Sequence, residues 1–188
     1  MNSLVIGRRD SGKTNFVKHL CGKMGSPVIV FCNDFRVGKE YSDLTNNIYL
    51  YREKDVDKFL DGRYSLSREI TIVFSDTVTS VKDFFKSKLC RHLFLNNRQY
   101  RLNLVFELQY CVDMKPELRA NTDQVWATRD MNSNNINRLA KYFDVKPSDE
   151  RFVFTNQVGE AIKAVFPVKP ALSDPIPYDG VRFVYAPR

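Results

Sequence analysis

A glycine-rich segment near the start of the chain carries the residues whose types and spacing most clearly predict chemistry. Residues 7–14 read Gly-Arg-Arg-Asp-Ser-Gly-Lys-Thr, which is the G-x-x-x-x-G-K-T pattern of a phosphate-binding loop. An apolar run precedes it and apolar residues at helical spacing follow it, so the loop stands between an expected strand and an expected helix, as the motif requires. The segment therefore predicts that the chain binds a nucleoside triphosphate, which we take to be ATP.

The chemistry of this loop follows from its residue types. Glycines allow successive backbone N–H groups to turn toward phosphate oxygens, and the amino end of the following helix adds a positive field. Lys13 is expected to bind the β- and γ-phosphates, and the Thr14 hydroxyl is expected to join the shell of a Mg²⁺ ion. The predicted nucleotide-binding residues are Gly7, Arg8, Arg9, Asp10, Ser11, Gly12, Lys13 and Thr14.

A carboxylate at the end of a second buried strand is expected to complete the Mg²⁺ site. The apolar run 70–74 predicts that strand, and Ser75, Asp76 and Thr77 follow it, so one acid stands where most such enzymes have two. Two assignments remain open: Asp76 serves the metal and Thr77 replaces the second acid, or Ser75 takes the metal position and Asp76 polarises water. In a third interpretation Asp76 only caps the loop.

The next predicted strand, residues 102–108, ends beside two further polar candidates. Gln109 fits a residue that touches the γ-phosphate or the attacking water. Glu107 lies two residues earlier and therefore on the same side of the strand, which makes it another candidate acid. We interpret Glu107 as a surface residue on a sheet edge, and assign the catalytic role to Gln109.

Apolar runs that alternate with helical patterns predict an α/β domain with a central, mostly parallel sheet flanked by helices. We expect the domain to span residues 1–166, and the proline-rich residues 167–188 to form a tail that packs on the domain or on a neighbouring subunit. Residues 33–43 are expected to form a polar loop. The predicted strands are 4–6, 28–32, 48–51, 70–74, 102–108 and 125–128, with 152–154 and 164–166 as candidates, and the predicted helices are 14–23, 54–60, 81–96 and 134–143.

The composition fits a globular domain with a basic surface. The 188 residues include 29 Lys and Arg against 22 Asp and Glu, which gives a net charge of +7. Such a charge favours nucleic acid as a partner, although a solvated basic surface without a partner explains it equally well. No apolar run approaches the roughly 18 residues of a membrane span, and the phosphate loop stands where a signal peptide would have its apolar segment, so we expect neither feature.

Cysteine and histidine residues predict no metal site. They are scattered, without a C-x-x-C pair or ligand-like neighbours, at Cys21, Cys32, Cys90, Cys111, His19 and His92. Buried free thiols in a reducing compartment are the expected state of the cysteines.

Three successive segments, 88–100, 104–110 and 113–123, carry a resemblance to a known family. They contain Asn96-Asn97-Arg98-Gln99, then a strand followed by Gln109-Tyr110, then Asp-Met-Lys-Pro-Glu-Leu-Arg-Ala-Asn at residues 113–121. With the phosphate loop, this succession is similar to the DNA-packaging ATPases of nucleocytoplasmic large DNA viruses, the poxvirus type, within the FtsK–HerA superfamily. The chain departs from that pattern at residues 75–76, where the family has paired acids, and at residues 96–99, where it has Asn-Gly-Arg-His.

The resemblance implies a RecA/FtsK-like fold and a homo-oligomeric ring that hydrolyses ATP to move double-stranded viral DNA into a capsid. The implied partners are the DNA backbone, further copies of the chain and capsid or portal-vertex proteins, in the cytoplasm or nucleus of the infected cell or in the virion. Arg119, and less strongly Arg98, match family arginines that reach the γ-phosphate of a neighbouring subunit, with Arg129 as a third option. The candidate contacts to DNA phosphates are Lys82, Lys86, Lys88, Arg36 and Lys39.

Two other functions stay open from the sequence. A small P-loop kinase for a nucleoside or nucleotide fits the length, but it is expected to carry an arginine-rich lid, and we recognise none. A nucleotide-binding subunit that hydrolyses slowly is consistent with the single acid at Asp76.

Overall fold

One twisted sheet organises the part of the chain that the structure describes. The computed structural model describes residues 1–7, 11–61, 68–75, 81–109, 114–128, 134, 137, 138, 141 and 181–185. Within these residues seven strands pair in the order β3-β2-β4-β5-β1-β6-β7. They are β1 (Asn2–Ile6), β2 (Val28–Cys32), β3 (Ile48–Leu50), β4 (Ile70–Ser75), β5 (Leu102–Leu108), β6 (Gln124–Thr128) and β7 (Val181–Tyr185).

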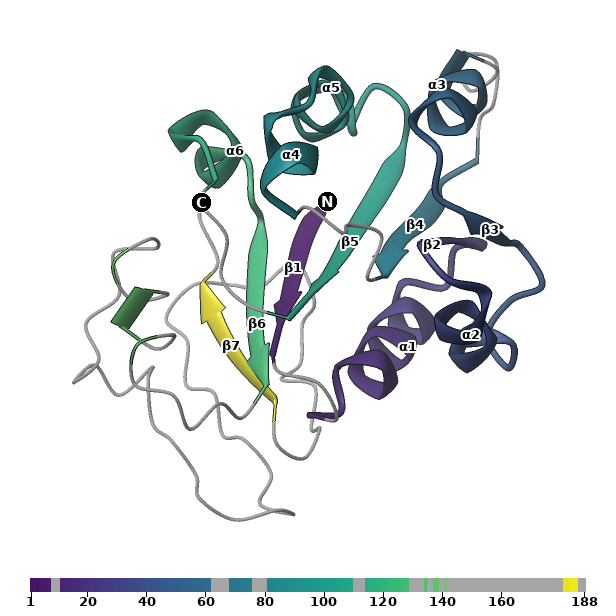
Figure 1. Cartoon of the computed structure of the whole chain (residues 1–188), viewed down its shortest axis with the longest axis horizontal. Coiled ribbons are helices and arrows are strands. Elements are labelled where there is room, and N and C mark those ends of the chain that lie inside the picture. The colour runs from purple at the N-terminus through teal and green to yellow at the C-terminus, as the bar shows by residue number, and fades with distance from the viewer. Residues whose placement is uncertain are drawn as a thin grey trace.

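The pairing is parallel from β3 through β6, and β7 runs antiparallel to β6. Parallel strands need crossover connections, and helices supply most of them and cover both faces of the sheet (Figure 1). On one face lie α1 (Lys13–Met24), α2 (Phe35–Gly38) and the 3₁₀ helix η1 (Lys39–Tyr41). On the other lie α3 (Glu53–Asp61), α4 (Val81–Lys86), α5 (Lys88–Asn96) and α6 (Pro116–Ala120). The expected α/β fold with a mostly parallel sheet is confirmed.

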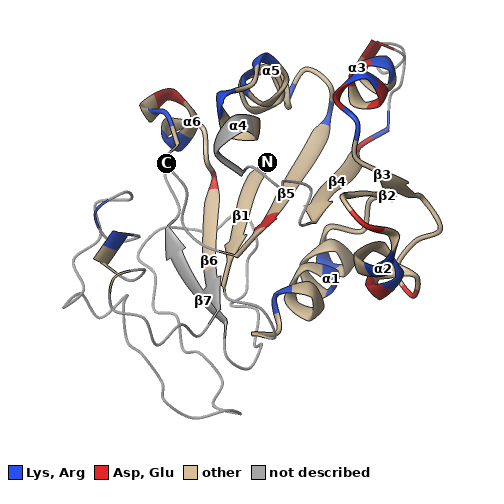
Figure 2. Cartoon of the chain, in the orientation of Figure 1, with Lys and Arg blue, Asp and Glu red and all other residues tan. Residues whose placement is uncertain are grey.

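Two apolar layers result, because neighbouring residues of a strand point to opposite faces. The layer under α3, α4, α5 and α6 is rich in stacked aromatic rings, and Phe106 lies at its centre with ring centroids 4.9 Å from Phe74 and 5.0 Å from Phe94. The layer under α1 is smaller and includes Phe16 against Trp126, with centroids 4.9 Å apart. Charged residues colour the helices and connections much more than the strands (Figure 2).

The predicted helix 81–96 is wrong as a single element. The structure has two helices, α4 and α5, with Ser87 between them in an extended conformation, φ −66° and ψ 154°. Its hydroxyl oxygen accepts a hydrogen bond from the backbone N–H of Cys90 at 3.0 Å. A serine that caps a helix satisfies a backbone donor that a continuous helix would have bonded internally, and this explains the break.

The predicted polar loop 33–43 is also wrong in part, because α2 and η1 form within it. Asp34 caps α2 by accepting a hydrogen bond from the N–H of Arg36 at 2.8 Å. Tyr41, at the end of η1, has no exposed surface at all. A short helix, α6, also precedes β6, and Pro116 occupies its first position, where proline is well tolerated.

Several expectations fall on residues that the structure does not describe. The candidate strands 152–154 and 164–166 lie outside the described residues, as does most of the predicted helix 134–143. Residues 181–185, within the proline-rich segment, form β7 and pair with the domain's own strand β6, while the boundary at residue 166 stays a prediction. Cys21, Cys32 and Cys90 are buried free thiols as expected, and burial raises the pKa of Cys21 to about 12. The described helices are all too short or too polar to cross a lipid bilayer.

Gly38 offers a test of how tightly η1 and α2 pack on the sheet. A Cβ atom at this position would lie 2.6 Å from Ile48 Cγ2 and 2.9 Å from Cys32 Sγ, so we expect Gly38→Ala to lower the free energy of unfolding by about 1–3 kcal/mol. Gly22→Ala is the matched control, because Gly22 is exposed within α1 and a Cβ there meets nothing within 4 Å; it should stabilise by about 0.5–1 kcal/mol. Urea denaturation measures both. Equal effects of the two substitutions would contradict the tight packing.

Candidate nucleotide-binding site

The sheet brings the ends of β1, β4 and β5 together at one end, which we call the carboxyl end of the sheet. β5 lies between the other two strands, and Glu107 is in register with Val5 of β1 on one side and with Ser75 of β4 on the other. Ligands of open parallel sheets bind at this end of the strands. The phosphate loop, Ser75 and Gln109 therefore share one region, as the sequence predicts.

The described part of the phosphate loop has the geometry that the motif requires. Gly7 follows β1 and its N–H donates to the carbonyl of Leu108 at 3.0 Å, which fixes where the loop leaves the sheet. Gly12 precedes α1 with φ 83° and ψ 9°, a left-handed conformation that glycine adopts without steric cost. Lys13 and Thr14 then open α1, so both lie at the positive end of a 12-residue helix. Of the remaining predicted residues, Ser11 is half-buried, and Arg8, Arg9 and Asp10 lie outside the described residues.

Lys13 is buried, with 6% of its surface exposed. The amino end of a helix, where Lys13 lies, is a favourable place for a phosphate group. The position of Lys13 is the one expected for a contact with the β- and γ-phosphates.

Glu107 is the unexpected member of the site. Its Oε1 accepts a hydrogen bond from Thr14 Oγ1 at 2.8 Å, and its Oε2 accepts from Ser75 Oγ at 2.5 Å and from the Tyr41 hydroxyl at 2.6 Å. Only 5% of Glu107 is exposed, and it is the one acidic residue of β5, visible as the red segment of that strand in Figure 2. The interpretation of Glu107 as a surface residue on a sheet edge is therefore wrong, because β5 is a central strand covered on both faces.

Tyr41 reaches this carboxylate from η1, on the face of the sheet that α1 covers. Burial, and then the neighbouring Glu107 carboxylate, raise the pKa of the Tyr41 hydroxyl well above its ordinary value. Tyr41 therefore stays protonated and remains a hydrogen-bond donor at neutral pH. An ion pair between Lys18 of α1 and Asp43, 2.9 Å apart, joins the segment just after η1 to the helix of the phosphate loop.

The donor set fits a nucleotide with a magnesium ion. Mg²⁺ prefers oxygen ligands, and the site offers the oxygen of the Thr14 hydroxyl, which donates its proton to the Glu107 carboxylate. Among the described residues no group of three or more His, Cys, Asp or Glu side chains forms a separate metal site. Thr14 would hold the ion and Lys13 would hold the phosphates.

The assignment of the acid after β4 stays open. Asp76 and Thr77 lie outside the described residues, and Ser75 is fully buried with its hydroxyl directed to Glu107. Gln109 is described and exposed at the carboxyl end of β5, so it is placed where a residue can reach a bound γ-phosphate. The catalytic roles of Asp76 and Gln109 remain predictions.

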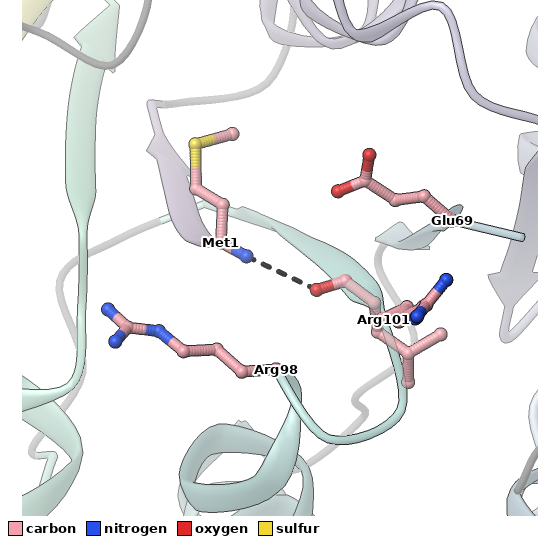
Figure 3. A pocket seen from close by; sticks show the side chains of 5 residues that line it. Met1, Glu69, Arg98 and Arg101 are labelled. Carbon is pink, nitrogen blue, oxygen red and sulfur yellow. Dashed lines mark hydrogen bonds between the residues drawn. The ribbon is translucent and has the colours of Figure 1, made fainter. Parts of the chain in front are cut away.

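Arg98 and Arg119 lie away from this site, toward the amino end of the sheet, and the third candidate, Arg129, lies outside the described residues. Arg98 lines a cavity of about 400 Å³ with Met1, Glu69, Arg101 and Leu102 (Figure 3), and Met1 directly precedes β1, the strand that leads to the phosphate loop. Its guanidinium lies 3.9 Å from Asp123. Arg119 is on α6 and donates to the carbonyl of Met114 at 3.4 Å. These contacts lie away from Lys13 and Thr14, so a role at the γ-phosphate would place either arginine at the site of a neighbouring subunit.

The candidate DNA contacts are only partly placed. Lys86, Lys88 and Lys39 are exposed, and Arg36 is paired with Asp34 at 2.9 Å. The side chain of Lys82 lies outside the described residues. These residues come from both faces of the sheet and do not define one continuous DNA surface.

Sequence reasoning missed Glu107 and Tyr41 as members of the site. A signal for Glu107 exists, because it is the one charged residue in an otherwise apolar or amide-bearing strand, and such a residue is buried only if it is paired. No comparable signal marks Tyr41 within its polar surroundings.

No protein-family model matches the chain. The chain is 29% identical over 161 residues to uncharacterized protein 075L of invertebrate iridescent virus 6, covering 79% of this chain and 62% of that protein. It is 25% identical over 169 residues to uncharacterized protein L437 of Acanthamoeba polyphaga mimivirus, covering 79% and 60%. The chain thus spans less than two thirds of the length of these relatives.

Solved structures share the fold. The genome packaging NTPase B204 from Sulfolobus turreted icosahedral virus 2 superposes with a TM-score of 0.58 in its sulfate complex, at 16% identity, over 75% of this chain and 80% of that chain. Its complex with ATP-gammaS gives 0.56 at 14% identity, over 76% and 81%. EssC (ATPases 2 and 3) from Geobacillus thermodenitrificans gives 0.53 at 12% identity, over 79% and 35%. The fold is that of RecA/FtsK-like P-loop ATPases. The finer resemblance to the poxvirus type stays a prediction.

Removing the Tyr41 hydroxyl tests the buried network. We expect Tyr41→Phe to lower the free energy of unfolding by about 1.5–3 kcal/mol, because the hydroxyl donates to a buried carboxylate. The raised pKa of Tyr41 contributes stability below the pKa of an unfolded tyrosine, about 10, and this contribution is lost as the pH rises above that value. The difference between wild type and variant should therefore shrink above that pH.

Urea denaturation at a series of pH values measures this difference. Tyr49→Phe is the control, because Tyr49 is 50% exposed on β3 and its loss of a hydroxyl should change stability by less than about 0.5 kcal/mol. A difference in the free energy of unfolding between wild type and Tyr41→Phe that stays constant across the alkaline range would contradict a raised pKa of Tyr41.

Proposed function

We propose that the chain is the ATP-hydrolysing subunit of a motor that moves double-stranded viral DNA into a capsid. The observation that carries the proposal is the carboxyl end of the sheet, where Lys13 is buried at the start of α1 and the Thr14 hydroxyl lies 2.8 Å from the buried carboxylate of Glu107. The likeness of the chain to a viral genome packaging NTPase, and to proteins of large DNA viruses, supports packaging over other uses of a P-loop. ATP and Mg²⁺ are the cofactors.

Within this proposal the chain acts in a homo-oligomeric ring. Asp76 and Gln109 serve the metal and the attacking water, and DNA is bound through its phosphates without a base sequence being read. The net charge of +7 supports a polyanionic partner. Capsid or portal-vertex proteins are the further partners, in the cytoplasm or nucleus of an infected cell or in the virion.

ATP hydrolysis with and without double-stranded DNA tests this function. Wild type should release phosphate faster when DNA is added, and the stimulation should fall as salt is raised, because DNA binding releases counterions. Lys13→Ala should lower turnover by about a hundredfold or more, because the lysine stabilises charge on the transferred phosphate. Lys23→Ala is the matched control: Lys23 is exposed at the opposite end of α1, and turnover should stay at the wild-type level.

Other outcomes identify the other functions. ATP binding without turnover under any DNA condition would contradict the motor and favour a nucleotide-binding subunit. Transfer of phosphate to a nucleoside, independent of DNA, would contradict it and favour a kinase.

An arginine that acts between subunits gives a second test. Arg119→Ala should lower turnover by a factor of about 10³, because such an arginine stabilises the γ-phosphate of the neighbouring subunit. Mixing Arg119→Ala with Lys13→Ala subunits should restore part of the activity, since some interfaces then combine an intact Lys13 with an intact Arg119. Arg98→Ala, which tests the other candidate arginine, is mixed with Lys13→Ala subunits in the same experiment.

Arg91→Ala is the control for this experiment. Arg91 pairs with Glu117 of α6 at 3.1 Å, so the substitution disturbs the same helix without removing a candidate catalytic group. A mixture whose activity equals the mean of its two components would contradict a role between subunits for the arginine in question.

A further inference from the structure

We propose that Glu107 is the acid that positions Thr14 for magnesium. The inference rests on the proposed ATP-binding function and names a residue of that site beyond the phosphate loop, Asp76 and Gln109. Glu107 acts through Thr14 and is therefore a positioning residue.

The first support is the way in which the carboxylate divides its hydrogen bonds. Oε2 accepts from Ser75 and Tyr41, at 2.5 and 2.6 Å, while Oε1 accepts from Thr14 at 2.8 Å. A carboxylate has about four acceptor positions, two on each oxygen. The two donors on Oε2 hold the group in place and leave Oε1 for the residue of the phosphate loop.

The second support is what this bond does to the Thr14 hydroxyl. A hydroxyl has one proton and two lone pairs, and its proton rotates to suit its neighbours. When Glu107 accepts the proton, the lone pairs of Thr14 Oγ1 are left for a cation. An acceptor of fixed position therefore prepares Thr14 as a metal ligand before the nucleotide arrives.

The third support is the cost of placing Glu107 where it is. A carboxyl group with only 5% of its surface exposed, in the middle of a sheet, is unfavourable unless hydrogen-bond donors or a cation compensate for its burial. Three hydroxyl groups provide neutral donors only, and no arginine or lysine is paired with Glu107 in the ion pairs of the described residues. A divalent cation one bond away, on Thr14, supplies the positive charge that such a site favours.

The competing explanation is that Glu107 only ties strands together. Its partners come from α1, β4 and η1, so the same bonds would stabilise the fold even if no metal were bound. The two explanations differ in one measurable respect. A purely structural carboxylate changes the stability of the protein but not the extent to which Mg²⁺ strengthens nucleotide binding.

Nucleotide binding with and without the metal separates the two. A fluorescent ATP analogue is titrated into the full chain at saturating Mg²⁺ and again in EDTA. The readout is the dissociation constant in EDTA divided by the dissociation constant at saturating Mg²⁺. Glu107→Gln should lower this ratio about tenfold or more, because outer partners of a metal ligand typically contribute that much to metal affinity. Binding in EDTA should be unchanged or tighter, since a negative charge near the phosphates has been removed.

Thr71→Val is the matched control, because it removes a buried hydroxyl that bonds Ser26 at 2.6 Å near the amino end of β4, away from Glu107 and Thr14. Its ratio should match that of wild type even though its stability falls. If Glu107→Gln does not fold, as judged by circular dichroism, Glu107→Asp replaces it: this variant keeps the charge but draws the carboxylate back from Thr14 by one methylene, and it should lower the ratio in the same direction.

The outcomes distinguish failure of this inference from failure of the proposed function. If wild type binds the analogue more tightly with Mg²⁺ and the folded Glu107 variant keeps the same ratio, the inference is overturned while the proposed function stands. If Thr71→Val lowers the ratio as much as Glu107→Gln, the loss follows from reduced stability alone and the inference is again overturned. If wild type binds no nucleotide in either condition, the proposed function fails and the inference fails with it.

Discussion

The buried carboxylate of Glu107 is the constraint on which the arrangement of the site depends. A charged group in the centre of a parallel sheet is tolerated only if its hydrogen-bonding capacity is largely used, and here a threonine, a serine and a tyrosine meet that need. These three side chains belong to α1, β4 and η1. The positions of a helix, a strand and a short 3₁₀ turn are therefore coupled through one functional group, and none of them can shift without leaving part of a buried charge unsatisfied.

Strand order makes this coupling possible. β5 lies between the strand that leads into the phosphate loop and the strand that leads to Ser75, and its register places Glu107 level with both. Had β1 and β4 been direct neighbours, the phosphate loop and Ser75 would have been closer, with no residue between them to bridge the two. The buried acid of this site is therefore carried by β5, and the segment after β4 has one acid where most such enzymes have two.

Most of the sheet could be predicted from the sequence, because 28–32 is a continuous apolar run and 70–74 and 102–108 are mainly apolar, as strands covered on both faces require. The phosphate loop and α1 could be predicted because glycine, lysine and threonine at fixed spacing have a specific physical role. The break at Ser87 and the burial of Tyr41 could not. The first depends on competition between a side-chain cap and a helical hydrogen bond, and the second on a partner 66 residues away.

Glu107 shows the same limit within the site. The alternation of side chains along a strand correctly places Glu107 and Gln109 on one face, but alternation does not say whether the strand is central or at an edge. That depends on how the strands are ordered, which only the folded chain determines. A residue taken as solvated from its type is in fact among the most completely hydrogen-bonded groups of the described site.

The long separation between these partners has a consequence for folding. Thr14, Tyr41 and Ser75 lie 93, 66 and 32 residues from Glu107 along the chain. Contacts between residues so far apart in the sequence form late, because the intervening loops must first be closed at an entropic cost. The nucleotide site is therefore completed only when the first hundred or so residues have assembled. A nucleotide that recognises this site binds the finished domain and not its partly folded forms, so ligand binding draws the folding equilibrium toward the native state.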